Sequence, residues 1–238
     1  MKSEPSALRD FTVDRRVWLL SGVSIGIGAC ATALAVLLLR CISLSTNLFY
    51  YHRFSLAPVS PAGSPLGYWM VTVPVIGGLL VGLMARFGSD KIRGHGIPEA
   101  IEAILLHRAR VDPKVAVLKP ISAAIAIGSG GPFGAEGPII MSGGAVGSLI
   151  AQWMHVTDAE RTTLLVAGAA AGMSATFATP VAAILIAVEL LLFEWRPRSL
   201  VPVAIASATA GLLRVYWLGA GPLFKMPTIL QLLALPSP

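Results

Sequence analysis

A glycine-rich stretch from Gly128 to Gly147 carries one carboxylate, Glu136, and constrains the fold more than any other part of the chain. No other Asp, Glu, Lys or Arg lies between Pro120 and Thr157, and the flanking residues are apolar enough to lie in lipid. A charged side chain at the centre of a membrane helix costs about 2.5–3.5 kcal/mol on insertion scales, so such residues are rare and usually functional. Lipid also requires backbone polar groups to be hydrogen-bonded internally, which favours helices here. Glu136 is therefore the first candidate for a functional residue.

Glycine and proline on both sides of Glu136 predict a break in the helix between about Gly128 and Gly137. Pro138 suits the first turn of a new helix, where a missing N–H group costs nothing. A helix that begins at depth directs free N–H groups and its positive dipole end into the membrane interior, and such an end binds anions. Glu136 would then be a built-in anion at an anion site, and we interpret it as a gate.

Two structural alternatives to the gate stay open at this point. Glu136 could pair with a buried arginine, although no Lys or Arg lies between Lys119 and Arg161. The glycines could serve only close helix packing, and this explains Gly143, Gly144 and Gly147 as small interface residues. Packing does not explain a carboxylate flanked by glycine and proline.

The composition is that of a membrane protein. Of the 238 residues, 55% are hydrophobic and 13% are charged, and the mean hydropathy is +0.76, whereas about a quarter of the residues of a soluble domain are charged. We therefore expect several membrane spans in contact with lipid, and no nucleic-acid partner, because no basic patch is interleaved with aromatic residues. The glycine stretch lacks the Gly-Lys-Ser/Thr of a nucleotide site, and the four histidines show no metal-ligand spacing. We expect no enzyme activity, no metal site and no cofactor.

The expected organisation is a polar arm over residues 1–16, a membrane region over residues 17–220 and a loop-like tail over residues 221–238. A helix of about a dozen residues, opened by Ile97-Pro98-Glu99, is too short to span and is either re-entrant or an amphipathic surface helix. Thr157 and Glu160 have the spacing of a capping box at a helix start. The other expected apolar segments cover residues 17–48, 68–87, 113–127, 138–153, 180–194 and 200–218.

The distribution of lysine and arginine predicts the orientation. Basic residues precede the first span and cluster after the second, at positions 86, 91, 93, 108, 110, 114 and 119. Cytoplasmic loops of membrane proteins carry an excess of such residues. The pattern predicts a multi-pass protein of the cell membrane with its N-terminus in the cytoplasm and these seven residues on the cytoplasmic side.

Three segments resemble a known family. Gly94-His95-Gly96-Ile97-Pro98-Glu99 resembles the motif GSGIPE, and Gly134-Ala135-Glu136-Gly137-Pro138 resembles GREGP. The run from Leu164 to Glu189 is similar to the stretch that leads to the family's internal glutamates. Together the motifs cover about residues 17–220 in the order and spacing of the CLC chloride channels and chloride/proton antiporters.

The resemblance implies an all-α membrane protein of tilted, re-entrant and broken transmembrane helices, similar to one of the two inverted halves of a CLC subunit. It implies a homodimer in which each subunit moves chloride or a similar anion, with protons in the antiporters. The gating glutamate would be Glu136, and Glu189 would be a candidate internal carboxylate. The anion-binding positions implied by the motifs are His95, Gly96, Ile97, Gly134, Ala135 and Gly137.

The sequence departs from the family at four points. His95 replaces an anion-coordinating serine, and it would either alter the site and its pH dependence or cap a helix. Ala135 replaces the arginine of GREGP, and Leu190 replaces the second internal glutamate of the antiporters. The chain also carries only one half of a CLC subunit, so we expect it to need a second half. The alternative is a truncated, non-transporting membrane fragment that acts only by assembly with partner helices.

Overall fold

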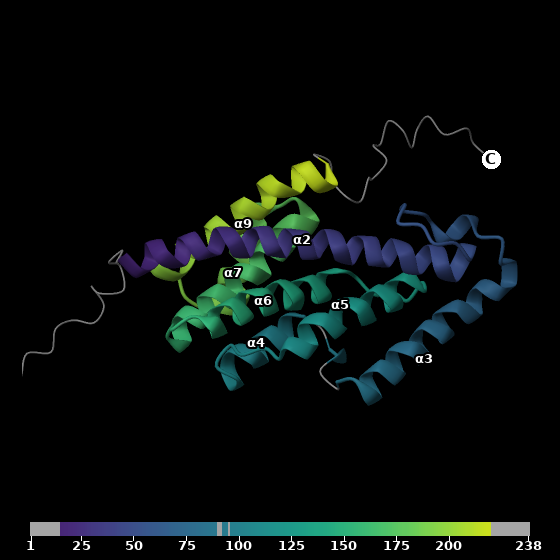
Figure 1. Ribbon diagram of the computed structural model, residues 1–238, viewed down its shortest axis with the longest axis horizontal. Helices are drawn as coiled ribbons and strands as arrows, with labels where there is room; N and C mark the ends of the chain where they lie inside the picture. Colours follow the sequence, from purple (N-terminus) through teal and green to yellow (C-terminus); the bar gives the residue numbers. More distant parts are fainter. Residues whose placement is uncertain (1–14, 90–91, 95, 220–238) are drawn as a thin grey trace, which may run out of the picture.

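The computed structural model describes residues 15–89, 92–94 and 96–219, and in these residues the chain is helical, without β-strands (Figure 1). This confirms the all-α prediction. Two short 3₁₀ turns lie at Pro61–Gly63 and Gly67–Val71, and a π-helical turn lies at Val188–Leu192. The α-helices are α2 (Arg15–Tyr51), α3 (Thr72–Phe87), α4 (Ile97–Leu106), α5 (Pro113–Gly128), α6 (Glu136–Trp153), α7 (Asp158–Phe177), α8 (Pro180–Ala187) and α9 (Pro197–Leu218).

Helix α2, the segment Gly67–Phe87 and helix α9 are each long and apolar enough to cross a membrane. With 37 residues and a rise of about 1.5 Å per residue, α2 is longer than a hydrocarbon core of about 30 Å, so α2 tilts or extends beyond the lipid. Figure 1 shows α2 along the longest dimension of the molecule, across the other helices. Large apolar side chains such as Val75, Leu79 and Leu83 of α3 point outward, as expected of a surface that faces lipid.

Helix α7 forms the centre of the packing, because small residues let its neighbours approach its backbone. From Leu164 to Thr176 every residue of α7 is buried. A Cβ atom on Gly143 of α6 would overlap the backbone of Gly168, and one on Gly147 would overlap the backbone of Leu164. The expectation that glycines of residues 143–147 permit tight helix contacts is confirmed at these two positions.

The predicted break before Glu136 is present. Helix α5 ends at Gly128 and α6 begins at Glu136, with Ala135 as its N-cap residue. Gly130 has a φ of +87°, a conformation that glycine adopts without steric cost. The Tyr50 hydroxyl donates a hydrogen bond of 2.9 Å to the carbonyl oxygen of Ser129, which ties the break to α2.

Some predicted boundaries differ from the structure. Arg15 and Arg16 are the first residues of α2 and do not belong to a separate arm; residues 1–14 and the tail 221–238 lie outside the described residues. The helix expected over residues 180–194 becomes π-helical at Val188 and ends at Leu192, and Phe193 adopts a left-handed conformation. The last helix begins at Pro197, three residues before the predicted start, because proline suits the first helical turn.

The other sequence signals of helix starts are confirmed. The side chain of Thr157 accepts a hydrogen bond from the N–H group of Glu160, and the Glu160 carboxylate accepts one from the N–H group of Thr157. Helix α4 starts at Ile97 and has 10 residues. A helix this short cannot cross a bilayer, in agreement with the prediction.

Candidate functional site

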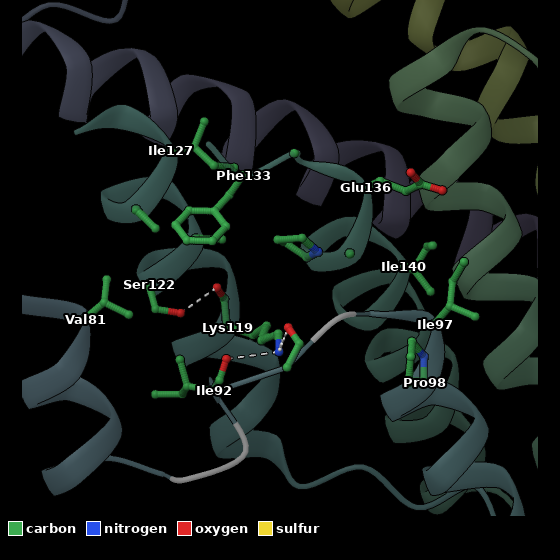
Figure 2. Close-up of a pocket in the computed structure, with 16 residues that line it drawn as sticks. Val81, Ile92, Ile97, Pro98, Lys119, Ser122, Ile127, Phe133, Glu136 and Ile140 are labelled. Atoms are coloured by element: carbon green, nitrogen blue, oxygen red, sulfur yellow. Dashed lines mark hydrogen bonds between the residues drawn. The ribbon is translucent and has the colours of Figure 1, made fainter. Parts of the chain in front are cut away.

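The two motif segments meet at one cavity of about 530 Å³, formed where α4 and α6 begin (Figure 2). Gly96 has a φ of +35°, and a Cβ atom there would overlap the backbone of Gly137. The backbones of the two helix starts are therefore in contact, and only glycine at position 96 permits this close approach. The cavity lining comes from α3, α4, α5, α6 and the loops between them: Val81, Ile92, Gly94, Ile97, Pro98, Lys119, Ser122, Ala123, Ala126, Ile127, Phe133, Gly134, Glu136, Gly137, Pro138 and Ile140.

Both helices begin at the cavity without a side-chain cap. The N-cap residues, Gly96 of α4 and Ala135 of α6, have no side-chain acceptor for the N–H groups of the first turn. The N-cap side chains Asp112 and Thr157, in contrast, accept such hydrogen bonds at the starts of α5 and α7. Uncapped N–H groups and the positive dipole ends of two helices give this cavity the electrostatics of an anion site.

Glu136 is the first residue of α6, and its side chain is exposed at the edge of the cavity. Among the described residues, no group donates a hydrogen bond to its carboxylate or forms an ion pair with it, so pairing with a buried arginine does not explain it. Figure 2 shows Glu136 and Lys119 on opposite sides of the cavity. The carboxylate is thus free to change position or protonation state without breaking a contact in the described part of the chain.

Lys119 lies on the opposite wall and is held by four contacts. Its Nζ atom donates to Glu99 Oε1 at 2.6 Å and Oε2 at 2.7 Å, and to the carbonyl oxygens of Ile92 at 3.1 Å and Gly94 at 3.2 Å. The Lys119 side chain is 4% exposed and that of Glu99 is 17% exposed. This buried ion pair joins α5, the loop before α4 and the first turn of α4, and so fixes one helix start relative to the cavity wall.

The cavity wall near the break between α5 and α6 is apolar, and a backbone hydrogen bond within the break holds it in place. Phe133 lines the cavity, and its N–H group donates to the carbonyl oxygen of Gly131 at 2.8 Å. Ser122 on α5 donates its hydroxyl to the Lys119 carbonyl oxygen at 3.0 Å. A largely apolar wall with a few directed polar groups is typical of small-ligand sites.

The structure brings most of the predicted site residues together. Ile97, Gly134, Glu136 and Gly137 line the cavity, while Gly96 and Ala135 are the N-cap residues next to it. His95 lies outside the described residues, and its role stays a prediction. Glu189 is exposed on the π-helical turn and is not among the residues that line this cavity.

Sequence reasoning missed the buried pair of Lys119 and Glu99. The sequence pattern counts Lys119 with the basic residues expected on the cytoplasmic side, and that location stays a prediction, but its side chain lines the cavity and is buried in an ion pair rather than exposed in a loop. The available signal was its position: Lys119 lies inside the expected apolar segment 113–127, where a lysine requires a partner. The partner is twenty residues away in the sequence, at a separation that no helical spacing rule connects.

The sequence of the chain is similar to those of known chloride channel proteins. A family model described as "voltage gated chloride channel" matches residues 77–237. A putative chloride channel protein, ClcB-like, of Ralstonia nicotianae is 26% identical over 208 residues, covering 85% of this chain and 48% of that protein. A voltage-gated ClC-type chloride channel, ClcB, of Yersinia pestis is 30% identical over 218 residues, covering 91% of this chain and 51% of that protein.

Two further relatives extend this result. An H⁺/Cl⁻ exchange transporter, ClcA, of Vibrio campbellii is 37% identical over 143 residues, covering 58% of this chain and 30% of that protein. The crystal structure of a slow cyanobacterial Cl⁻/H⁺ antiporter shares the fold with a TM-score of 0.64 at 22% identity, over 92% of this chain and 50% of the antiporter. The chain spans about half the length of the ClcB-type relatives that it matches.

Proposed function

The chain belongs to the voltage gated chloride channel family, and from this premise we propose that it forms the anion-binding half of a chloride channel or chloride transporter. The cavity between the starts of α4 and α6 binds chloride or a similar anion, and the Glu136 carboxylate competes with that anion for the N–H groups of α6. The observation that carries the proposal is the convergence of two helix starts without side-chain caps on one cavity. The carboxylate of Glu136, which has no partner in the described part of the chain, borders this cavity.

The proposed gate works by exchange of one anion for another. When Glu136 is charged and turned toward the start of α6, it satisfies the N–H groups and excludes chloride. When Glu136 is protonated or turned outward, the N–H groups are available and chloride enters. A fixed anion at a helix N-terminus is stabilised by about 0.3–1 kcal/mol at exposed positions and up to about 2 kcal/mol when partly buried. An interaction of this size is small enough to be reversed by protonation of the carboxylate or by a rise in anion concentration.

The assembly that we propose has three further parts. The cavity of this half is completed by a second CLC half, and two such units form a homodimer in the cell membrane with the N-terminus in the cytoplasm. His95, which precedes Gly96 in the sequence, contributes to anion selectivity on the cytoplasmic approach. Glu189 is the internal carboxylate, and Leu190 at the next position weakens proton coupling.

Replacement of Glu136 by Gln tests the gate. The variant keeps the helix start and the volume of the side chain but removes the charge, so anion flux into reconstituted vesicles should be retained or increased and its dependence on pH should be lost. The measurement is chloride flux together with the yield of folded protein, for the chain co-expressed with a second CLC half.

The matched control is Glu102→Gln, because Glu102 lies on α4 but outside the cavity lining. This variant should leave flux and its pH dependence unchanged. A well-folded Glu136→Gln protein without flux would exclude the gate. A Glu136→Gln protein that no longer folds would instead indicate that Glu136 has a structural role and would also exclude the gate.

A further inference from the structure

The ion pair of Lys119 and Glu99 separates the cavity at Glu136, here called the first cavity, from a second cavity of about 280 Å³. Lys119 lines the first cavity and Glu99 lines the second. The second cavity is lined by charged residues of both signs and by a few apolar ones: Arg93, Glu99, Glu102, Ala103, His107, Arg110, Val111, Asp112, Val115 and Met141.

At two places, consecutive residues of the chain line the two cavities. Along the loop before α4, Ile92 lines the first cavity and Arg93 the second; in α4, Pro98 lines the first and Glu99 the second. The Nζ atom of Lys119 lies 2.6 Å from Glu99 Oε1. The positive charge of Lys119 therefore lies next to the first cavity. The carboxylate that neutralises it, that of Glu99, lines the second cavity.

Lys119 carries the only positive charge among the described residues that line the first cavity, yet its hydrogen-bonding capacity is used up. An ammonium group has three donors and no acceptor. Two carboxylate oxygens and two carbonyl oxygens lie within 3.2 Å of Nζ. No donor is left over for an anion in the cavity, and the net charge of the pair is zero.

We propose that Glu99 acts as the fixed counter-anion of Lys119, and that it keeps the anion affinity of the first cavity low enough for rapid release. This inference rests on the proposed function, because it concerns the same anion site. Transport requires binding that is favourable enough for entry and weak enough for exit. An unneutralised ammonium beside two helix N-termini would hold an anion tightly, and Glu99 prevents this. Glu99 is a positioning residue in this account and does not itself contact the anion.

The proposal predicts opposite effects for the two members of the pair. Glu99→Gln keeps an acceptor for Lys119 but removes the compensating charge, so anions should bind more tightly, by at least about tenfold for one unit charge within about 12 Å at an effective dielectric constant of about 20. Lys119→Gln leaves the Glu99 carboxylate without its cation beside the cavity, so anion affinity should fall by at least about tenfold. The double variant Lys119→Met with Glu99→Gln removes both charges, and its affinity should lie within about threefold of that of the unmodified protein.

The test measures the bromide concentration that produces half of the anion-dependent rise in thermal stability, with gluconate as the counter-ion control. It is made on the detergent-solubilised full chain, co-expressed with a second CLC half, and it needs no transport. Tighter binding by Glu99→Gln that disappears in the double variant supports the proposal. Glu102→Gln is the control, because it removes a carboxylate that lines only the second cavity. It should leave the bromide concentration for half-maximal stabilisation unchanged.

Failure of the counter-anion proposal can be distinguished from failure of the proposed transport function, because the first is measured as bromide affinity and the second as chloride flux. Weaker binding in both single variants, or no change in either, overturns the counter-anion role even when flux is present. If Lys119→Gln fails to fold, the comparison of Glu99→Gln with the double variant still decides, because these two differ in the charge of Lys119. Equal affinity of the two variants overturns the proposal.

Discussion

At the scale of single residues, the site depends on glycines that allow two helix starts to touch. Gly96 and Gly137 are in backbone contact, and Gly94, with a φ of +149°, leaves room for the Glu99 carboxylate. A side chain at position 96 would displace the start of α6, and one at position 94 would displace the ion pair. The residues that shape the cavity thus differ from those that supply its charge.

Replacement of Gly96 by Ala tests this contact. The added Cβ atom would overlap the backbone of Gly137, which is not free to move, and the positive φ adds strain. Overpacking and a left-handed backbone each cost on the order of 1–3 kcal/mol, so the thermal stability of the purified protein should fall clearly. Gly78→Ala is the control, because nothing lies within 4 Å of a Cβ atom there. Equal melting temperatures of the two variants would contradict the close approach of α4 and α6.

The charge-bearing residues were predictable from sequence to different degrees. Glu136 was found because it is isolated in an uncharged stretch between glycine and proline, and the structure places it at the start of α6. The burial of Lys119 could not be predicted in this way, because the positive-inside rule counts basic residues by their place in the sequence and does not indicate which of them is buried in an ion pair. The pairing of Lys119 with Glu99 depends on how α4 packs against α5, and no local pattern records that packing.

At the scale of helices, the contact between α6 and α7 holds the start of α6 at the cavity. Gly143 of α6 lies against Gly168 of α7, and Gly147 lies against Leu164. Lipid provides little hydrophobic driving force between helices, so close backbone packing has to supply the association. The position of Glu136 at the cavity is therefore set partly by glycines that lie two or three turns further along α6.

Replacement of Gly147 by Ala should separate these helices. A Cβ atom there would overlap the carbonyl group of Leu164, so the variant should be destabilised by about 1–3 kcal/mol. Gly144→Ala is the matched control on the same helix, because its Cβ atom would lie 3.4 Å from the end of the Leu165 side chain, an ordinary contact. The measurement is thermal unfolding of both variants in detergent. A Gly144→Ala protein less stable than Gly147→Ala would contradict the observed register of α6 on α7.

The sequence predicted most helix starts, because caps and prolines are local signals. The capping box of α7, the short helix α4 and the break before α6 are present as expected. The π-helical turn at Val188–Leu192 was not predicted, since a π turn inserts one residue into an otherwise regular helix and leaves the composition unchanged. This turn carries Glu189, so the direction of that carboxylate could not be obtained from helical periodicity.

At the scale of the whole molecule, we propose that the chain supplies one wall of a transport path. It spans about half the length of its ClcB-type relatives, and the carboxylate of Glu136 is exposed. The membrane fold could be predicted from apolar length and charge patterning alone. We propose that a second CLC half covers the exposed edge of the cavity.

Proton coupling in the complete assembly should be weak. Glu189 is followed by Leu190, so the route that we propose for protons from the inside lacks its second carboxylate. Proton uptake driven by a chloride gradient in vesicles should be small relative to chloride flux, and Glu189→Gln should reduce it further without lowering chloride flux. Glu194→Gln is the control, because the Glu194 carboxylate accepts a hydrogen bond from Ser199 at the start of α9. Stoichiometric proton uptake that survives Glu189→Gln would contradict this assignment.

The central claim is that an anion binds between the starts of α4 and α6 when the carboxylate of Glu136 does not. The most direct measurement is anomalous diffraction from crystals grown in bromide, for the unmodified protein and for Glu136→Gln in the same assembly. The account predicts bromide beside the N–H groups of residues 136 and 137 at higher occupancy in the Glu136→Gln crystals, where an uncharged side chain no longer competes for the site. Bromide absent from this cavity in both crystals, with ordered α4 and α6, would contradict it.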